Sequence, residues 1–444
     1  MDSRNKTTLH TTLGQYSPSG FFTKTWFSPE DIRLADPGGP TYEQNWHIWS
    51  TFLHEWFHHL QIIGTTYGRF HYDITLTAGA CISRALRQLF EIHDLGRLRR
   101  PVLLDLCRLS NTIDQDPLIL GSRAAAIRTA LFGDDQDVST AIPASLTAPL
   151  STSSPHIEVA GNSYVMGGRH ILEGHARSNE TVYLAWTLSQ KTFCEAMDQM
   201  GDLDPYQLAE AHLRTRAGLN DEILLRLLCD VAMNPGWLER SERIAWEDFH
   251  PGWRFVRMVD ALVEDLPLRR LTPSETDWDK LDDYTALHEA LLARFGWKRP
   301  EHILPATTGD FPWFSSAVLR LRTKAPLAFA LLTENMKIMQ AISPLRFDSY
   351  TPSDLKSELS ETLKPAEEFE ARRYMAIIFD NTVNELLTKR YLTCPIHGTS
   401  FPSSTGCPTP CHFPGFFRSN FGISIEQFLS IPLSDQGEGR RLVP

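Results

Sequence analysis

The chain has 444 residues, of which 42% are hydrophobic and 22% are charged, as in an ordinary globular protein. This composition excludes collagen-like, coiled-coil and wholly disordered classes. With 54 acidic and 43 basic residues, the formal net charge is −11, so we expect no broad nucleic-acid-binding surface.

The sequence also predicts where the chain resides. No apolar run approaches the roughly 18 residues of a membrane span, and the N-terminus lacks the apolar stretch of a secretory signal. Seven cysteines are few and odd in number, which does not indicate a disulfide framework. We therefore expect a soluble, reduced, cytoplasmic protein that does not bind membranes.

The first long element is predicted within residues 41–63. Before it, residues 1–40 are polar and turn-rich, apart from an aromatic stretch at 21–27 that predicts a small β element. Residues 41–63 contain neither proline nor glycine and carry apolar side chains on nearly every face, which predicts a buried helix. Thr41 and Gln44 resemble a capping box, and Gly64 is a suitable end.

Helical patterns continue along most of the remaining chain. Residues 134–158 are rich in Ser, Thr and Pro and predict a loop or flexible insertion. A long helix is predicted from Gly168 to about Met200. Further helices are predicted at 73–93, 101–132, 205–217, 220–233, 241–248, 252–265, 279–295, 313–322, 324–341, 353–363 and 366–390. The predicted fold class is therefore mainly α.

The main chemical signal is the sequence His54-Glu55-Trp56-Phe57-His58 inside the predicted buried helix. Residues at positions i and i+4 lie on one helical face, so His54 and His58 can both offer a ring nitrogen to one metal ion. Glu55 is then free to accept a proton from a water that the metal activates. Burying three ionisable groups in one turn is costly, and a metal compensates all three.

A catalytic zinc needs a third protein ligand and one open position. The residues after His58 contain no further histidine at the spacing of the extended motifs, so the ligand must come from elsewhere. Glu173 is our candidate, because it lies in a helical segment in which the small Ala176 lets two helices approach closely. His170 shares a helical face with Glu173 and is the alternative ligand, and both His170 and His175 are candidates for binding substrate or for contacting a metal ligand.

The combination of H-E-x-x-H with a later E-G-x-A glutamate resembles the gluzincin group of zinc metallopeptidases. The spacing from His54 to Gln61 also resembles bacterial proteins of unknown function with H-E-x-x-H-x-x-Q. The resemblance implies a zincin-like helical metallohydrolase core, with His54, His58 and Glu173 as zinc ligands and Glu55 as general base.

The resemblance covers residues 42–66 and 165–186. More than a hundred residues separate the second histidine from the later glutamate, so an insertion at 67–160 must fill the gap. We predict four parts of the chain: an N-terminal segment 1–40, a catalytic region 41–265, a helical region 266–392, and a Cys/His-rich segment with a tail at 393–444.

The chain differs from some gluzincins at the carboxylate that would orient a zinc-bound histidine. Some gluzincins place an aspartate four residues after the ligand glutamate, where this chain has Arg177. Asp230, one acid in an otherwise apolar helix, is a candidate substitute. A structural partner such as an arginine explains Asp230 equally well. Candidates for stabilising an oxyanion are Tyr164, Arg169, His175 and Tyr183.

A second cluster of metal-ligand residues lies near the C-terminus. Cys394 and His397 form one pair, and Cys407 with either Cys411 or His412 forms another. The intervening Pro, Gly, Ser and Thr residues favour knuckle-like turns, so the cluster predicts a structural zinc site. Free thiols or a disulfide are the alternatives.

Three functions are compatible with these residues. A zinc-dependent metallopeptidase acting on a peptide or protein substrate is the leading hypothesis. In the second, Glu55-x-x-His58 and Glu247-x-x-His250 form a helical di-iron oxidoreductase site. In the third, a peptidase-like fold acts as a non-catalytic scaffold, and the C-terminal element recognises a protein partner.

Overall fold

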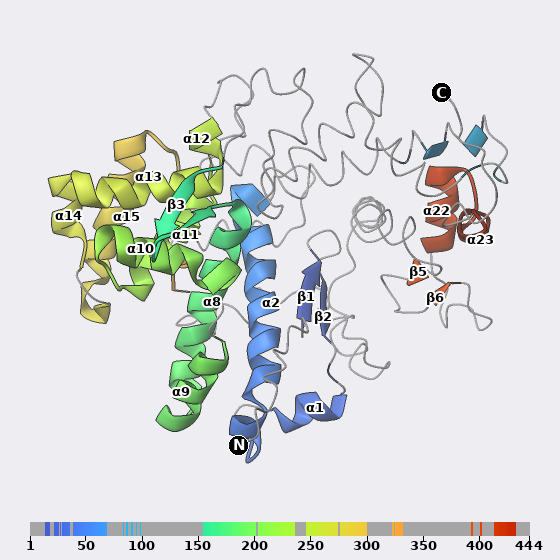
Figure 1. The fold of residues 1–444 in the computed structure, drawn as a ribbon, viewed down its shortest axis with the longest axis horizontal. Helices are drawn as coiled ribbons and strands as arrows, with labels where there is room; N and C mark the ends of the chain where they lie inside the picture. The colour runs from blue at the N-terminus through green and yellow to red at the C-terminus, as the bar shows by residue number, and fades with distance from the viewer. Residues whose placement is uncertain are drawn as a thin grey trace.

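The computed structural model describes the chain in several ranges. These are 14–17, 22–25, 27, 29–35, 39–68, 154–200, 203–235, 246–273, 276–299, 322–323, 325–331, 392–393, 400–401 and 413–431, with single positions between 83 and 98. The described part is mainly helical (Figure 1), which confirms the predicted class. None of its helices has the length and apolarity needed to cross a membrane. The predicted helices at 101–132, 353–363 and 366–390 lie outside the described residues.

The N-terminal part contains a small antiparallel hairpin. Strands β1 (Gly14–Ser17) and β2 (Phe22–Thr25) pair with Gly14 opposite Thr25. The aromatic stretch at 21–27 therefore contains a strand, as predicted. A short helix, α1 (Pro29–Leu34), follows, and the hairpin lies against the next long helix.

Helix α2 (Trp46–Gly64) carries the H-E-x-x-H sequence and is buried along most of its length. It ends at Gly64, as predicted, but it begins later than Thr41. A 3-10 turn, η1 (Tyr42–Gln44), comes first. The Thr41 hydroxyl donates to the Leu34 carbonyl at 2.7 Å and therefore does not cap a helix. The predicted capping box is therefore wrong.

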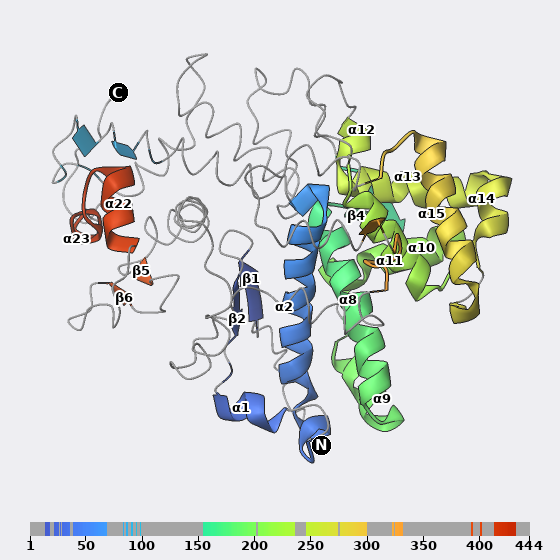
Figure 2. The ribbon, with the colours of Figure 1, turned by 180° about the vertical axis from the view of Figure 1, so that it is seen from behind.

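Helix α8 (Gly168–Thr187) lies beside α2, as Figures 1 and 2 show. The single helix predicted from Gly168 to Met200 is interrupted at Leu188 and Ser189, and α9 (Gln190–Gln199) follows. Ser189 caps α9, and the Glu43 carboxylate accepts hydrogen bonds from the Ser189 backbone N–H at 3.1 Å and from its hydroxyl at 2.9 Å. These bonds compensate the broken helical ladder.

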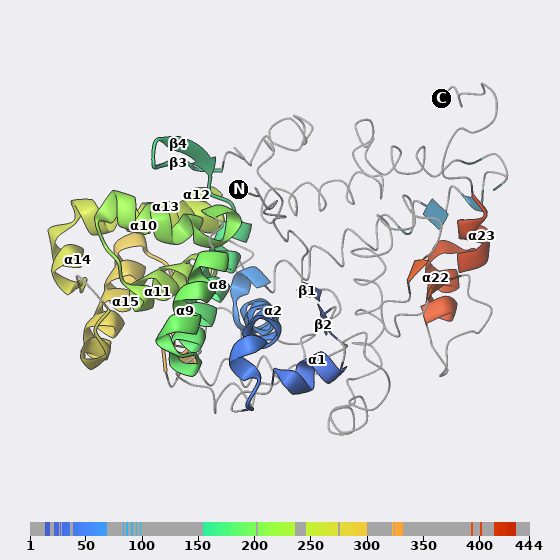
Figure 3. The ribbon, with the colours of Figure 1, turned by 60° about the horizontal axis from the view of Figure 1, so that its bottom comes forward.

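A group of helices covers the side of α8 that faces away from α2 (Figure 3). The group contains a π-helical turn, η3, a 3-10 turn, η4, and six α-helices, of which α13 and α15 are the longest. Their bounds are η3 (Leu203–Gln207), α10 (Leu208–Ala217), α11 (Glu222–Ala232), α12 (Trp246–Phe249), α13 (Pro251–Glu264), α14 (Leu266–Leu271), η4 (Trp278–Lys280) and α15 (Leu281–Phe295). Helix α8 is thus the central element between α2 and this group.

A second hairpin precedes α8, formed by β3 (His156–Val159) and β4 (Asn162–Val165). Its two-residue turn, Ala160-Gly161, has positive φ at both positions, which suits the twist of paired strands. The predicted loop at 134–158 is therefore wrong over residues 156–158.

The C-terminal described elements are strands β5 (Leu392–Thr393) and β6 (Ser400–Phe401) and helices α22 (Phe413–Phe421) and α23 (Ile425–Leu429). The two helices pack on the described residues near position 90, where the Phe90 and Phe428 rings lie 5.8 Å apart. The predicted zinc ligands Cys394, His397, Cys407 and Cys411, with the alternative His412, lie outside the described residues, so this site stays a prediction.

The end of α2 is packed too tightly for a side chain. A methyl group on Gly64 would lie 2.0 Å from Cζ of Phe329. We expect Gly64→Ala to lower the free energy of unfolding by about 1–3 kcal/mol, because the buried ring and helix must move apart. Chemical denaturation measures this. Gly415→Ala is the control, since an added methyl group there meets no atom within 4 Å; equal midpoints for both variants would contradict the packing.

Candidate metal centre

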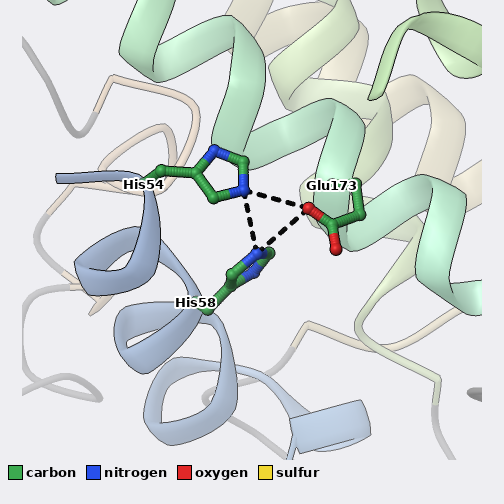
Figure 4. Close-up of side chains that lie close together, drawn as sticks. All are labelled: His54, His58 and Glu173. Atoms are coloured by element: carbon green, nitrogen blue, oxygen red, sulfur yellow. Dashed lines mark hydrogen bonds and ion pairs between the residues drawn. The ribbon is translucent and has the colours of Figure 1, made fainter. Parts of the chain in front are cut away.

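Three predicted ligands from two helices converge on one point. Figure 4 shows His54 and His58 of α2 pointing toward Glu173 of α8. The Nε2 atoms of the two histidines lie 3.2 Å apart, and Oε2 of Glu173 lies 3.0 Å from His54 Nε2 and 3.2 Å from His58 Nε2. Within the described ranges, these three residues form the group whose ligand atoms are close enough to hold one metal ion.

The dimensions of this triangle fit a zinc ion. Ligand atoms about 2.1 Å from a tetrahedral zinc lie about 3.4 Å from one another. The three observed separations are only a few tenths of an ångström shorter. Two imidazole nitrogens and one carboxylate oxygen are also a common catalytic zinc ligand set. A metal ion could take the place of the hydrogen bonds among His54, His58 and Glu173 with little movement of the side chains.

The outer nitrogen of His54 is held by Glu180, a residue that the sequence analysis missed. Its Oε2 lies 3.2 Å from His54 Nδ1, and it also accepts hydrogen bonds from Ser50 and, at 3.1 Å, from Arg177. Because the carboxylate can only accept from Nδ1–H, Nε2 is the nitrogen of His54 that can offer a lone pair to a metal ion once its proton is lost. Glu180 lies seven residues, two helical turns, after Glu173, a spacing that could have identified it.

Hydrogen bonding and charge dominate the protonation of the metal-free centre. Burial disfavours the charged form of His54, but the bonds and charges of Glu173 and Glu180 outweigh it and raise the His54 pKa to about 10. Burial likewise opposes ionisation of Glu173, yet the two histidines keep the pKa of that carboxyl well below its usual value. The metal-free centre is therefore a protonated histidine paired with carboxylates.

Glu55 and Tyr206 are the other ionisable groups at the centre. Glu55 is buried on α2, and its negative charge helps to raise the pKa of both His58 and Tyr206, although burial contributes more to the Tyr206 shift. The Tyr206 ring packs edge-on against His54, with centroids 5.7 Å apart. No sequence pattern identified Tyr206 as a site residue, because its place depends on how η3 folds against α8.

Two other candidate residues have structural partners. His170 lies at the start of α8, where its Nδ1 accepts a hydrogen bond from the Gly167 backbone N–H at 2.8 Å. Asp230 pairs with the buried Arg322, which donates to its two carboxylate oxygens at 2.7 and 2.9 Å. The carboxylate next to His54 is therefore Glu180, and not Asp230.

The candidates for oxyanion stabilisation occupy different places. Arg169 lies one turn before Glu173, with Nε 3.8 Å from its Oε1. His175 bonds to Gln61 on α2. Tyr183 lies near Tyr42, and Tyr164 is in β4. Of the described tyrosines, Tyr206 has its ring against His54.

The second E-x-x-H sequence, Glu247 to His250, contributes no residue to the group formed by His54, His58 and Glu173. His250 is the N-cap of α13, where its Nδ1 accepts from the Trp253 backbone N–H at 3.3 Å. Glu247 belongs to the short helix α12.

Comparison with known protein families, with curated proteins and with solved structures finds no match to this chain. The geometry of the centre is therefore the basis for assigning a function.

Glu180→Gln should weaken zinc binding about 10–100-fold, because it removes the charged partner of His54 Nδ1. Competition with a chromophoric chelator measures the dissociation constant. The matched control is Glu195→Gln, an exposed acid on α9. If both variants bound zinc as the unmodified protein does, Glu180 would not orient the ligand.

Zinc affinity should also depend on pH. In the metal-free protein, His54 holds a proton up to about pH 10, and zinc must displace it. The affinity should therefore rise with pH below that value, by about tenfold per unit for each displaced proton. Calorimetry in buffers of different ionisation enthalpy counts the released protons. An affinity unchanged from pH 6 to 8, with no proton release, would contradict the pairing.

Proposed function

We propose that the protein is a zinc-dependent hydrolase, and specifically a metallopeptidase that cleaves peptide or protein substrates. The observation that carries the proposal is the convergence of His54 Nε2, His58 Nε2 and Glu173 Oε2 within 3.2 Å, with Glu55 next to His54 in the same helix. Three protein ligands leave a fourth position open, as catalysis requires.

Each residue has a distinct role in this proposal. A bound zinc supplies a Lewis acid that polarises the substrate carbonyl and lowers the pKa of water. Glu55 accepts the proton of the attacking water and passes it to the leaving amine. The Tyr206 phenol, whose pKa burial raises to about 12, keeps its proton and donates a hydrogen bond to the developing oxyanion.

The geometry supports a gluzincin-like assignment within a zincin-like core. Two histidines one turn apart on one helix meet a glutamate on an adjacent helix, which is the arrangement implied by the sequence resemblance. Glu180 supplies the orienting carboxylate that Arg177 does not supply. Arg177 instead donates to Glu180 and to the Met200 carbonyl, and so holds that carboxylate in place.

The C-terminal cysteines and histidines complete the proposal with a second, structural zinc ion. Metal analysis of the purified chain should then give two zinc ions per chain. A value near one would argue against one of the sites, and His54→Ala would show which site is filled.

Hydrolysis is tested by removing the metal and adding it back. The metal-free protein should leave a mixed peptide library intact, and stoichiometric zinc should start cleavage at defined bonds. Mass spectrometry identifies the products. A zinc-loaded protein that cleaves nothing in such libraries would favour the scaffold hypothesis, and two irons per centre would favour the oxidoreductase.

A further inference from the structure

A chain of buried hydrogen bonds leads away from the metal position on the His58 side. His58 Nδ1 lies 2.8 Å from Oε1 of Gln61. The Gln61 amide nitrogen lies 3.0 Å from Nδ1 of His175 and 2.8 Å from the Leu172 carbonyl. His175 Nε2 lies 2.9 Å from the Phe329 carbonyl. The chain thus joins α2, α8 and the segment 325–331.

Two backbone carbonyls, Phe329 at the outer end of the chain and Leu172 beside Gln61, fix the direction of every bond. A carbonyl only accepts, so His175 donates from Nε2 to Phe329, and Gln61 donates from its amide nitrogen to Leu172. The same amide nitrogen faces His175 Nδ1, which must accept. The Gln61 oxygen therefore accepts from His58 Nδ1–H. This leaves the Nε2 lone pair of His58 available to the metal.

The outer end of the chain is closely packed. The Phe329 ring packs against Gly64 and against the Arg322 guanidinium, whose carbon lies 3.8 Å from the ring centroid. Arg322 also donates to the Gly64 carbonyl at 2.7 Å. Gln61 and His175 have no exposed surface, so water cannot replace a lost partner.

We propose that Gln61 and His175 are positioning residues that hold His58 in the Nδ1–H tautomer and so present its Nε2 to the metal. Neither residue touches the metal position. The inference rests on the metal centre of the proposed function, but it does not require that the centre cleaves peptides.

Variants at Gln61 separate tautomer control from packing. Gln61→Met keeps the volume but removes the acceptor, and we expect it to weaken zinc binding about 10–100-fold. Gln61→Glu keeps an acceptor for His58 Nδ1–H but loses the amide donor to Leu172 and His175, so it should bind zinc more tightly than Gln61→Met and less tightly than the unmodified protein. If residue 61 only filled space, both variants would bind zinc equally well.

Substitutions at two histidines test the hydrogen bond between Gln61 and His175. His175→Phe should weaken zinc binding about tenfold, because Gln61 then loses one of the two partners that fix its amide. The matched control is His212→Phe, a buried histidine on α10 whose ring nitrogens bond to no described residue; it should leave the affinity unchanged. Equal affinities for His175→Phe and His212→Phe would overturn the role of His175.

Long-range ¹H–¹⁵N spectra of histidine-labelled, zinc-loaded protein read the tautomer without any activity assay. We expect His58 to show a protonated Nδ1 and a metal-bound Nε2, a pattern lost in Gln61→Met and kept in Gln61→Glu. A metal-bound Nδ1 in the unmodified protein would overturn the proposal. Zinc binding and the spectra do not depend on hydrolysis. An inactive protein with the expected spectra would therefore contradict the proposed function and leave the role of Gln61 and His175 in place.

Discussion

Glu55→Gln should lower the rate of zinc-dependent hydrolysis by about 10²–10⁴-fold and leave zinc binding intact. The amide has the size of the carboxylate but cannot accept the proton of the attacking water. Glu55 is not one of the three residues that could hold the metal ion, so the zinc dissociation constant should stay within a few-fold of its original value. Turnover of a cleaved library peptide and chelator competition measure the two quantities.

Glu158→Gln, on the exposed side of β3, is the matched control for this variant and should retain full activity. Full activity of Glu55→Gln would remove Glu55 from the mechanism. If Glu55→Gln lost zinc as well as activity, Glu55 would hold the metal or the fold and would not act as the base.

Arg322→Met should lower the free energy of unfolding by about 3–5 kcal/mol, because it leaves the buried Asp230 carboxylate without its cation. The Arg322 side chain is 3% exposed and the Asp230 side chain 5% exposed, so water cannot solvate the remaining charge. Removing both charges in Asp230→Leu/Arg322→Met should recover more than half of the loss. Urea denaturation measures all three proteins.

An exposed ion pair provides the comparison. Arg216 Nε lies 2.7 Å from Asp260 Oδ1, and the two side chains are 46% and 37% exposed. Arg216→Met should therefore lower the free energy of unfolding by less than about 1 kcal/mol. The same small cost for Arg322→Met would contradict the buried pair.

The parts of the site with a local origin were predictable from sequence. Histidines four residues apart must share a helical face, and a proline-free apolar segment must be buried, so His54, His58 and the body of α2 were identified. Glu173 was also found, with His170 as the alternative, because it lies in a helical segment in which the small Ala176 lets two helices approach closely. These inferences need only helical periodicity and the preferences of zinc.

The remaining parts depend on contacts between distant segments. Asp230 was recognised as an unusual buried acid, but its partner Arg322 lies 92 residues further along the chain, and no local pattern names it. Tyr206 reaches His54 only because a π-helical turn packs against α8.

The interruption between α8 and α9 has a local signal in the sequence. Ser189 is a good N-cap residue, and it marks the interruption between α8 and α9. The start of α2 is different, because Thr41 bonds backward to the Leu34 carbonyl, which local propensity does not predict.

The zinc-loaded structure of the protein tests the central claim most directly. We predict one zinc ion held by Nε2 of His54, Nε2 of His58 and a carboxylate oxygen of Glu173, each at about 2.0–2.2 Å, with the fourth position facing Glu55. A zinc ion held elsewhere, or a centre that binds none while the two helices stay folded, would contradict the account.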